Sequence, residues 1–411
     1  MWSKIYIEDE VRKKNIKMVL FVALAIMLLA LPLVACAQPA PAPAPTPAPA
    51  PAPAEQVEPI KIGAVLDLTG PIAQFGHQFR NVMEMRFEEA NYEAAGRPIE
   101  FIIEDGATDI AISQDKVRKL VERDQVNVIL GPLQSDIAMA ATPYMHEHGV
   151  TSICLDAHPL EIREYGSWIV YAGTLYSYGW ALGGYAVEEL GYKTAVSLGA
   201  DYVAGYRFVG GVLDSFKEAG GTVIQEQWAP IDTADYGPYY SAMKDADVLL
   251  FWTPGSPPAM KQYFEFGMEA PVLFSNANII SASFFEAVGD PALGMRGSAG
   301  YVSNIDNPLN KSFVAKFREI YGRSPDQIDA HGYIVTSMLL AALEKTGGDT
   351  TFETLQSAYR EISFDTINGP VSIDSDGIAI SNRYIVEARK VDGEYVWEAI
   401  ATIHQVRDPR R

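Results

Sequence analysis

The chain has 411 residues, of which 32 are Lys or Arg, 52 are Asp or Glu and only two are Cys. Residues 1–36 hold five basic and three acidic side chains, so the remainder carries 27 basic and 49 acidic ones, a formal charge of −22. Such an acidic body excludes nucleic-acid binding through clustered Lys and Arg, and two cysteines exclude a disulfide scaffold or a thiolate zinc cluster.

An export signal is predicted at the N-terminus, where a cluster of lysines (residues 13–17) precedes an uncharged apolar run over residues 18–38. The run contains Leu-Val-Ala-Cys at residues 33–36, which resembles the lipobox of bacterial lipoproteins. The resemblance implies that residues 1–36 are a signal peptide and that Cys36 is lipidated. The alternatives are an uncleaved membrane anchor, which the short run disfavours, or a Cys that follows the signal by chance.

Residues 37–54 form a Pro/Ala linker, with eight prolines in eighteen positions. Proline fixes φ and lacks an amide donor, so this segment is predicted to be neither helix nor sheet. As polyproline II it would reach up to roughly 55 Å, at about 3.1 Å per residue. Whether the linker is a stiff spacer or a disordered tether, it places the body outside the cytoplasm.

Short β-branched runs alternate with helical patterns from Ile60 onward. The predicted strands are 60–66, 99–103, 126–130, 150–155, 194–198, 222–227, 248–252 and 272–275, with three more at 371–373, 384–388 and 395–403. The predicted helices are 78–92, 112–121, 135–145, 180–190, 206–219, 309–321 and 328–343. Residues 171–178 read as a loop, and Asp392-Gly393 as a hairpin turn. The pattern predicts an α/β protein with two doubly wound parallel-sheet lobes, between which the chain crosses more than once.

Motifs typical of catalysis or metal binding are absent or incomplete. The sequence has no G-x-S-x-G nucleophile elbow, no G-x-x-x-x-G-K-[ST] phosphate loop and no G-x-G-x-x-G after its first strand. His146 and His148 flank Glu147, but residues i and i+2 of a helix point to different sides, which disfavours a metal site. Cys154 ends an apolar strand and is interpreted as a buried structural thiol. We therefore predict no enzyme, no cofactor and no metal site.

Three segments together resemble the leucine/isoleucine/valine-binding family of extracytoplasmic solute-binding proteins of ABC importers. They are IGAVLDLTGPIAQFG at 62–76, ILGPLQS at 129–135 and NGPVSIDSDG at 368–377. The resemblance implies the periplasmic binding protein type 1 fold, in which a three-crossover hinge joins two lobes that clamp a solute. It implies an N-terminal lobe of residues 58–173 plus 304–378 and a C-terminal lobe of residues 174–303 plus 379–405.

The candidate site follows from the carboxyl ends of the strands, where parallel sheets bind ligands. In amino-acid binders of this family the Ser matching Ser135 holds the ligand carboxylate, although Ser135 could also simply cap its helix. The matching Thr position is about Ala157, and the second-lobe carboxylate falls near Asn276 to Asn278, which are neutral, so the amino-acid clamp is incomplete. Either Asp156 replaces the ammonium partner or the ligand carries no ammonium. The candidate ligand-binding residues are Phe75, Leu133, Gln134, Ser135, Asp156, Ala157, His158, Tyr202, Tyr206, Trp252 and Asn276.

These features predict a monomeric solute-binding lipoprotein, held through Cys36 at the outer face of the cell membrane. It would capture a small organic solute and deliver it to the permease subunits of an ABC importer. The solute would be a branched-chain amino acid or an amide, urea or aromatic carboxylate. The ligand would favour a closed form, because it contacts both lobes only there. A ligand-sensing partner of a membrane signalling receptor with the same fold is the alternative, and an exported enzyme is disfavoured.

Overall fold

The structure is a computed structural model that describes residues 57–156, 158, 161–162, 168–170, 173–277, 282–391 and 393–410. The predicted signal peptide, the linker and Cys36 lie outside the described residues, as do Ala157 and Asn278. Residues 57–411 belong to one compact unit. Among the described residues, no helix is both long enough and apolar enough to cross a membrane.

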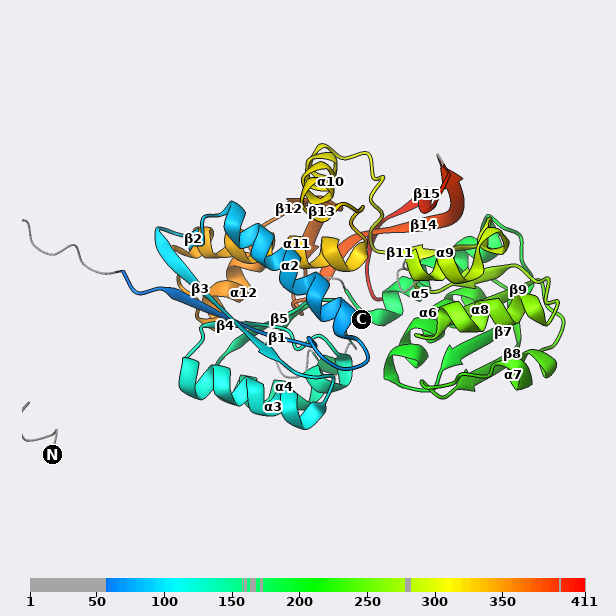
Figure 1. Ribbon diagram of the computed structural model, residues 1–411, viewed down its shortest axis with the longest axis horizontal. Helices are drawn as coiled ribbons and strands as arrows, with labels where there is room; N and C mark the ends of the chain where they lie inside the picture. Colours follow the sequence, from blue (N-terminus) through cyan, green and yellow to red (C-terminus); the bar gives the residue numbers. More distant parts are fainter. Residues whose placement is uncertain are drawn as a thin grey trace, which may run out of the picture. The chain divides into compact units, whose positions relative to one another are not determined.

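The first lobe is built on a sheet whose strands run in the order β2-β3-β1-β4-β5-β6. These are β1 (Ile60–Leu66), β2 (Glu93–Ala94), β3 (Arg97–Asp105), β4 (Val128–Leu130), β5 (Thr151–Cys154) and β6 (Trp168–Val170), all paired in parallel except β2 with β3. Over one face lie α2 (Ala73–Glu89), α11 (Gln327–Thr346) and α12 (Phe352–Glu361). Over the other lie α3 (Ile110–Arg118), its π-helical extension Lys119–Asp124, and α4 (Ser135–Glu147) (Figure 1). Helix α10 (Pro308–Tyr321) packs on α11 through Phe313 and Tyr333, whose ring centroids are 4.6 Å apart.

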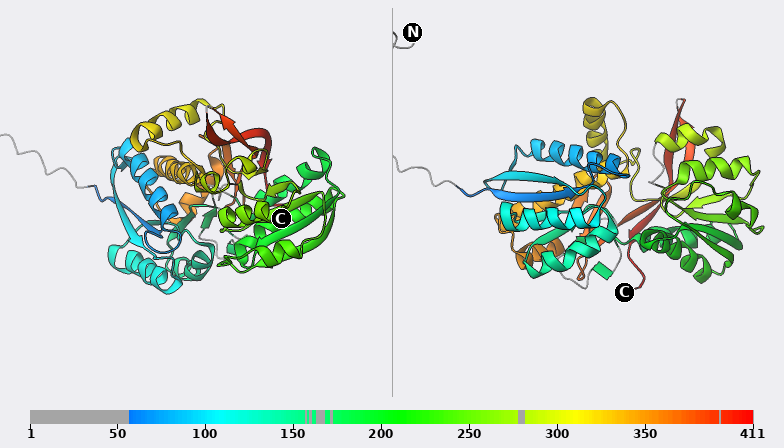
Figure 2. Two further views of the ribbon diagram at one scale, coloured as in Figure 1. Left: turned by 45° about the vertical axis from the view of Figure 1, so that its right-hand side comes forward. Right: turned by 60° about the horizontal axis from the view of Figure 1, so that its bottom comes forward.

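The second lobe is built on five parallel strands in the order β11-β10-β9-β7-β8. They are β7 (Thr194–Ala200), β8 (Thr222–Ala229), β9 (Val248–Trp252), β10 (Val272–Phe274) and β11 (Arg296–Ala299). Helices α5 (Leu175–Glu188) and α6 (Val203–Glu218) pack on one face of this sheet. Helices α7 (Gly237–Ser241), α8 (Ser256–Glu265) and α9 (Ala282–Val288), with the short 3-10 turn Asp290–Ala292, cover the other. Figure 2 gives two further views of these layers.

Four C-terminal strands extend this sheet in antiparallel fashion. Strand β14 (Ala379–Val391) pairs with β11 and with β15 (Glu394–Val406), and its first residues pair with β13 (Gly369–Ile373), which pairs with β12 (Phe364–Thr366). The chain therefore passes between the lobes after β6, after β11 and along β14. The predicted fold class, two doubly wound lobes with a three-crossover hinge, is confirmed. The C-terminal strands run longer than the apolar residues alone predicted.

The strands are apolar throughout because both of their faces are covered. On β9, Val248, Leu250 and Trp252 belong to the apolar cluster that includes α5 and α6, whereas Leu249 and Phe251 belong to the cluster of α7 and α8. This alternation is the period of two that a strand imposes on its side chains. The strand ends are thus held by cores on both sides, and the loops that follow them start from fixed positions.

Helices α5 and α6 touch backbone to backbone. A Cβ atom at Gly211 of α6 would lie 2.2 Å from the carbonyl oxygen of Tyr176 on α5, and one at Gly179 of α5 would lie 2.1 Å from that of Phe208 on α6. Because only glycine fits at such an approach, the two helices form one closely packed pair. Helix α5 follows the first crossover and α6 follows Tyr202, so this contact links the hinge to the candidate site.

Candidate functional site

The carboxyl ends of β1, β4 and β5 lie side by side, because β1 pairs with β4 and β4 with β5. Phe75, on α2, is half-buried against the main apolar cluster, and Leu133 and Gln134 are half-buried in the loop after β4. Ser135 is the first residue of α4, as predicted. The N-cap position belongs to Gln134, so Ser135 is not the capping residue. The first amides of α4 have no acceptor within the helix, which leaves them suited to an anion.

Asp156 has a partner within its own lobe. Its Oδ1 atom lies 2.9 Å from Nδ1 of His331 on α11, and the two side chains are 25% and 2% exposed. The sequence pattern gave no signal for His331, because the apolar periodicity of α11 predicts only a core helix there. The candidate ammonium partner is therefore a carboxylate that already contacts a buried imidazole.

His158 and Cys154 are buried beside this pair. The backbone of His158 pairs with Thr174, where the chain enters the second lobe. Burial lowers the pKa of His158 to about 4, although the nearby Asp156 opposes the shift. The imidazole is consequently neutral at neutral pH. Burial also raises the pKa of the Cys154 thiol, consistent with the structural role expected for it.

Aromatic side chains gather at the strand ends of the second lobe. Tyr202 follows β7 and Trp252 is the last residue of β9, and their ring centroids are 5.8 Å apart. Phe208 of α6, which sequence reasoning missed, lies 4.7 Å from Trp252. Trp252 is 2% exposed, whereas Tyr202 is half-buried. Asn276, two residues after the end of β10, is buried.

Tyr206 is not brought together with these rings. It is 44% exposed, and its ring lies 4.3 Å from that of Trp228 on β8, the strand at the end of the sheet. Its hydroxyl donates a hydrogen bond to the carboxylate of Asp201. Of the two tyrosines predicted beside the site, Tyr202 is thus the one that contacts Trp252.

Helices α4 and α6 bring the two lobes together, with Cα atoms of the two helices within 8 Å. Burial raises the pKa of the Tyr202 phenol, and Asp136 in the first turn of α4 raises it further. Arg207 of α6 forms an ion pair with Glu161, which lies between β5 and β6. Ser135 and Tyr202 therefore stand at facing ends of two helices from different lobes. Sequence spacing could not reveal these contacts, since each joins segments from separate sheets.

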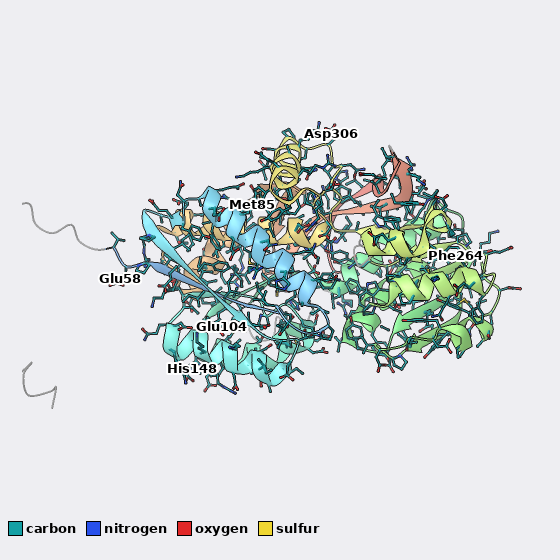
Figure 3. The ribbon with its side chains drawn as sticks, in the orientation of Figure 1. Glu58, Met85, Glu104, His148, Phe264 and Asp306 are labelled. Atoms are coloured by element: carbon teal, nitrogen blue, oxygen red, sulfur yellow. The ribbon has the colours of Figure 1, made fainter. Side chains whose placement is uncertain are left out.

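Neither a metal centre nor the described cavity coincides with the strand ends. In the part of the chain that the structure describes, no group of three or more His, Cys, Asp or Glu side chains could hold a metal ion. His148 directly follows α4 at the protein surface (Figure 3), with Nδ1 2.9 Å from the carbonyl oxygen of Tyr144. A cavity of about 430 Å³ lies between α2, α10, α11 and β12, remote from these residues in the fold. We place the candidate site at the strand ends, because side chains with ligand-binding chemistry follow the strands there.

Known proteins resemble this chain over most of its length. The model of the periplasmic binding protein family matches residues 59–394. A relative named Leu/Ile/Val-binding protein homolog 6, from Brucella abortus, is 26% identical over 85% of this chain and 93% of its own. A solute-binding protein of an ABC transporter from Rhodopseudomonas palustris, solved with 3,4-dihydroxybenzoic acid, is 27% identical with a TM-score of 0.79, over 85% of this chain and 99% of its own. An ABC transporter substrate-binding protein from Sphaerobacter thermophilus has the same identity and coverage and a TM-score of 0.80.

Proposed function

Since the chain belongs to the periplasmic binding protein family, we propose that it is the solute-binding component of an ABC importer and that its solute is a small aromatic carboxylate. The family is extracytoplasmic and consists of binding proteins, so the predicted family and the predicted absence of enzymatic activity are confirmed. The choice of ligand class rests on the site.

The contact between Asp156 and His331 is the observation that carries this choice. An amino-acid ligand brings a buried ammonium that needs a carboxylate, because an unpaired buried charge is costly. Asp156 already lies 2.9 Å from His331, and the second-lobe position near Asn276 is neutral. A ligand without an ammonium group needs no carboxylate partner, so it is compatible with both the paired Asp156 and the neutral Asn276.

The remaining side chains suit an aromatic acid. The ligand carboxylate would accept hydrogen bonds from the Ser135 hydroxyl and the first amides of α4, where the helix dipole favours a negative charge. The ring would rest beside Tyr202 and Trp252, which Phe208 supports, with Phe75 on the opposite lobe. Aromatic pairs of this kind stabilise a complex beyond the area that they bury. Because Ser135 and Tyr202 belong to different lobes, the ligand would favour the arrangement in which the lobes meet.

Calorimetric titration with 3,4-dihydroxybenzoate, 4-hydroxybenzoate and leucine tests the proposal. We expect both aromatic acids to bind. Ser135→Ala should lower the affinity for them roughly tenfold to more than a hundredfold, because it removes one hydrogen bond to a charged group. Ser312→Ala, which changes an exposed serine on α10, should leave the affinity unchanged. Wild-type affinity in Ser135→Ala would show that the carboxylate binds elsewhere.

A branched-chain amino acid is the second candidate, favoured by the name of the Brucella relative. Tight binding of leucine together with no binding of either aromatic acid would replace the proposed ligand by this one. The same titration therefore decides between the two classes.

We further propose that the protein is a monomeric lipoprotein attached through Cys36, which lets it deliver solute to a permease in the same membrane. The lipobox-like residues 33–36 and the Pro/Ala linker behind them support this arrangement. A bilayer-anchored protein on a linker of this length stays within reach of the membrane surface.

A further inference from the structure

Trp252 holds a buried hydrogen-bond donor that the fold does not satisfy. The side chain is 2% exposed, and its Nε1 atom has no acceptor among the residues that the structure describes. The great majority of buried polar side-chain atoms have a partner, so a donor without one needs an explanation. An indole N–H can only donate, and its direction is fixed by the ring, so it cannot rotate to another acceptor as a hydroxyl can.

Packing alone does not explain the choice of Trp at this position. Its neighbours Tyr202 and Phe208 are aromatic and lie 5.8 and 4.7 Å away between ring centroids. A Phe would stack with both rings and would bury no unsatisfied N–H. Burying the indole N–H without a partner therefore lowers the stability of the fold, which an apolar ring would avoid. The choice of Trp is explained if a bound molecule supplies the acceptor.

The position of Trp252 makes a ligand the natural source of that acceptor. It ends β9, next to β7, whose carboxyl end leads to Tyr202. Tyr202 is half-buried and close enough to Asp136, beside Ser135, to be affected by its charge. Trp252 thus adjoins Tyr202, at the end of the helix that approaches α4 of the other lobe.

We propose that Trp252 donates its indole N–H to an oxygen substituent on the ring of the ligand, so that the protein selects hydroxylated aromatic carboxylates over unsubstituted ones. This inference rests on the proposed function, in which Ser135 and α4 hold the carboxylate at the other end of the molecule. A ring hydroxyl opposite the carboxyl group supplies an acceptor at the required end. Benzoate and the side chains of branched-chain amino acids supply none and would leave the donor unsatisfied.

The comparison of 4-hydroxybenzoate with benzoate tests the inference. A site built to bond a hydroxyl discriminates against the analogue that lacks it, and we expect wild-type protein to prefer 4-hydroxybenzoate roughly ten- to a hundredfold. Trp252→Phe keeps an aromatic ring and removes the donor, so the preference should fall to within about threefold. Trp180→Phe, which changes a half-buried tryptophan that stacks on Tyr176 of α5, should keep the wild-type preference.

Each outcome of these titrations has one meaning. Equal wild-type affinity for the two acids, or an unchanged preference in Trp252→Phe, overturns the inference and leaves the proposed function intact. Failure of both acids to bind overturns the proposed function itself. If Trp252→Phe does not fold, NMR titration of the wild-type protein, followed through its indole N–H proton resonances, tests the inference instead. One of them should move downfield with 4-hydroxybenzoate and not with benzoate, and no such movement overturns the inference.

Discussion

Adjacent glycines on α6 allow the packing of α5 and α6 to be measured against an internal control. A Cβ atom at Gly211 would lie 2.2 Å from the carbonyl oxygen of Tyr176, whereas one at Gly210 would have no atom within 4 Å. Real Cβ contacts stay above 3.0 Å, so Gly211→Ala must force the two helices apart by about 0.8 Å. Gly210→Ala demands no such movement.

The expected changes in the free energy of unfolding follow from two opposing effects. Replacing Gly by Ala inside a helix stabilises the fold by about 0.5–1 kcal/mol, and both variants gain this amount. Overpacking costs about 1–3 kcal/mol, and the upper end applies to Gly211→Ala because the obstructing atom belongs to the backbone. Gly211→Ala should therefore be about 2 kcal/mol less stable than wild type, and Gly210→Ala up to about 1 kcal/mol more stable.

Urea unfolding followed by circular dichroism and by fluorescence would measure both free energies of unfolding. Coincident transitions from the two probes would establish that the free energies are comparable. Equal stability of Gly210→Ala and Gly211→Ala would refute the close approach of α5 and α6. It would also remove the argument that this contact links the hinge to Tyr202.

Three further predictions concern His158, its neighbour Asp156, and Cys36. Burial lowers the pKa of His158 from 6.5 to about 4, so the stability that it contributes is present above pH 6.5 and is lost as the pH falls toward 4. Between about pH 7 and about pH 4.5, wild type should lose about 2 kcal/mol more than His158→Gln in urea titrations, while a His404→Gln control at an exposed site should follow wild type. Asp156→Asn should change the Kd for 4-hydroxybenzoate by less than about threefold, whereas a loss beyond about a hundredfold would identify Asp156 as a ligand contact. Cys36→Ser should release the protein from the membrane fraction or stop its processing, and unchanged attachment with an uncleaved N-terminus would indicate a signal anchor instead.

The alternating order of strands and helices could be predicted because covered parallel strands are apolar on both faces. The five apolar residues of β9 and the helical periodicity of α10 illustrate this, and both elements occur within one residue of the predicted bounds. The start of α5 could not be predicted from periodicity. Its first residues belong to the segment 171–178 that reads as a loop, and Gly179, which directly follows this segment, serves the contact with α6. The Thr174 side chain, which accepts from the Ser177 amide, was the local signal available.

The candidate site was less predictable, because its contacts join distant parts of the chain. Strand ends and the family resemblance name Ser135, Tyr202 and Trp252 as candidates from the sequence, and the structure brings the rings of Tyr202 and Trp252 into contact. The pairing of Asp156 with His331 depends on how α11 lies over the first sheet, and no local pattern encodes that. The same holds for Phe208, whose contact with Trp252 depends on the packing of α6 against β9.

The path of β14 bears on when the protein folds. The strand begins beside β13 and ends between β11 and β15, so the second sheet is not complete until nearly the whole chain has been synthesised, and the first sheet, whose strands end with β6, receives its covering helices α11 and α12 only after β11. Pairings between residues far apart in sequence form slowly, because the intervening loop must close first. A secretory channel accepts an extended chain more readily than a finished domain. For a polypeptide with a predicted export signal, late completion of the second sheet and late covering of the first would keep the nascent chain in a translocatable form and postpone its final collapse until it reaches the far side.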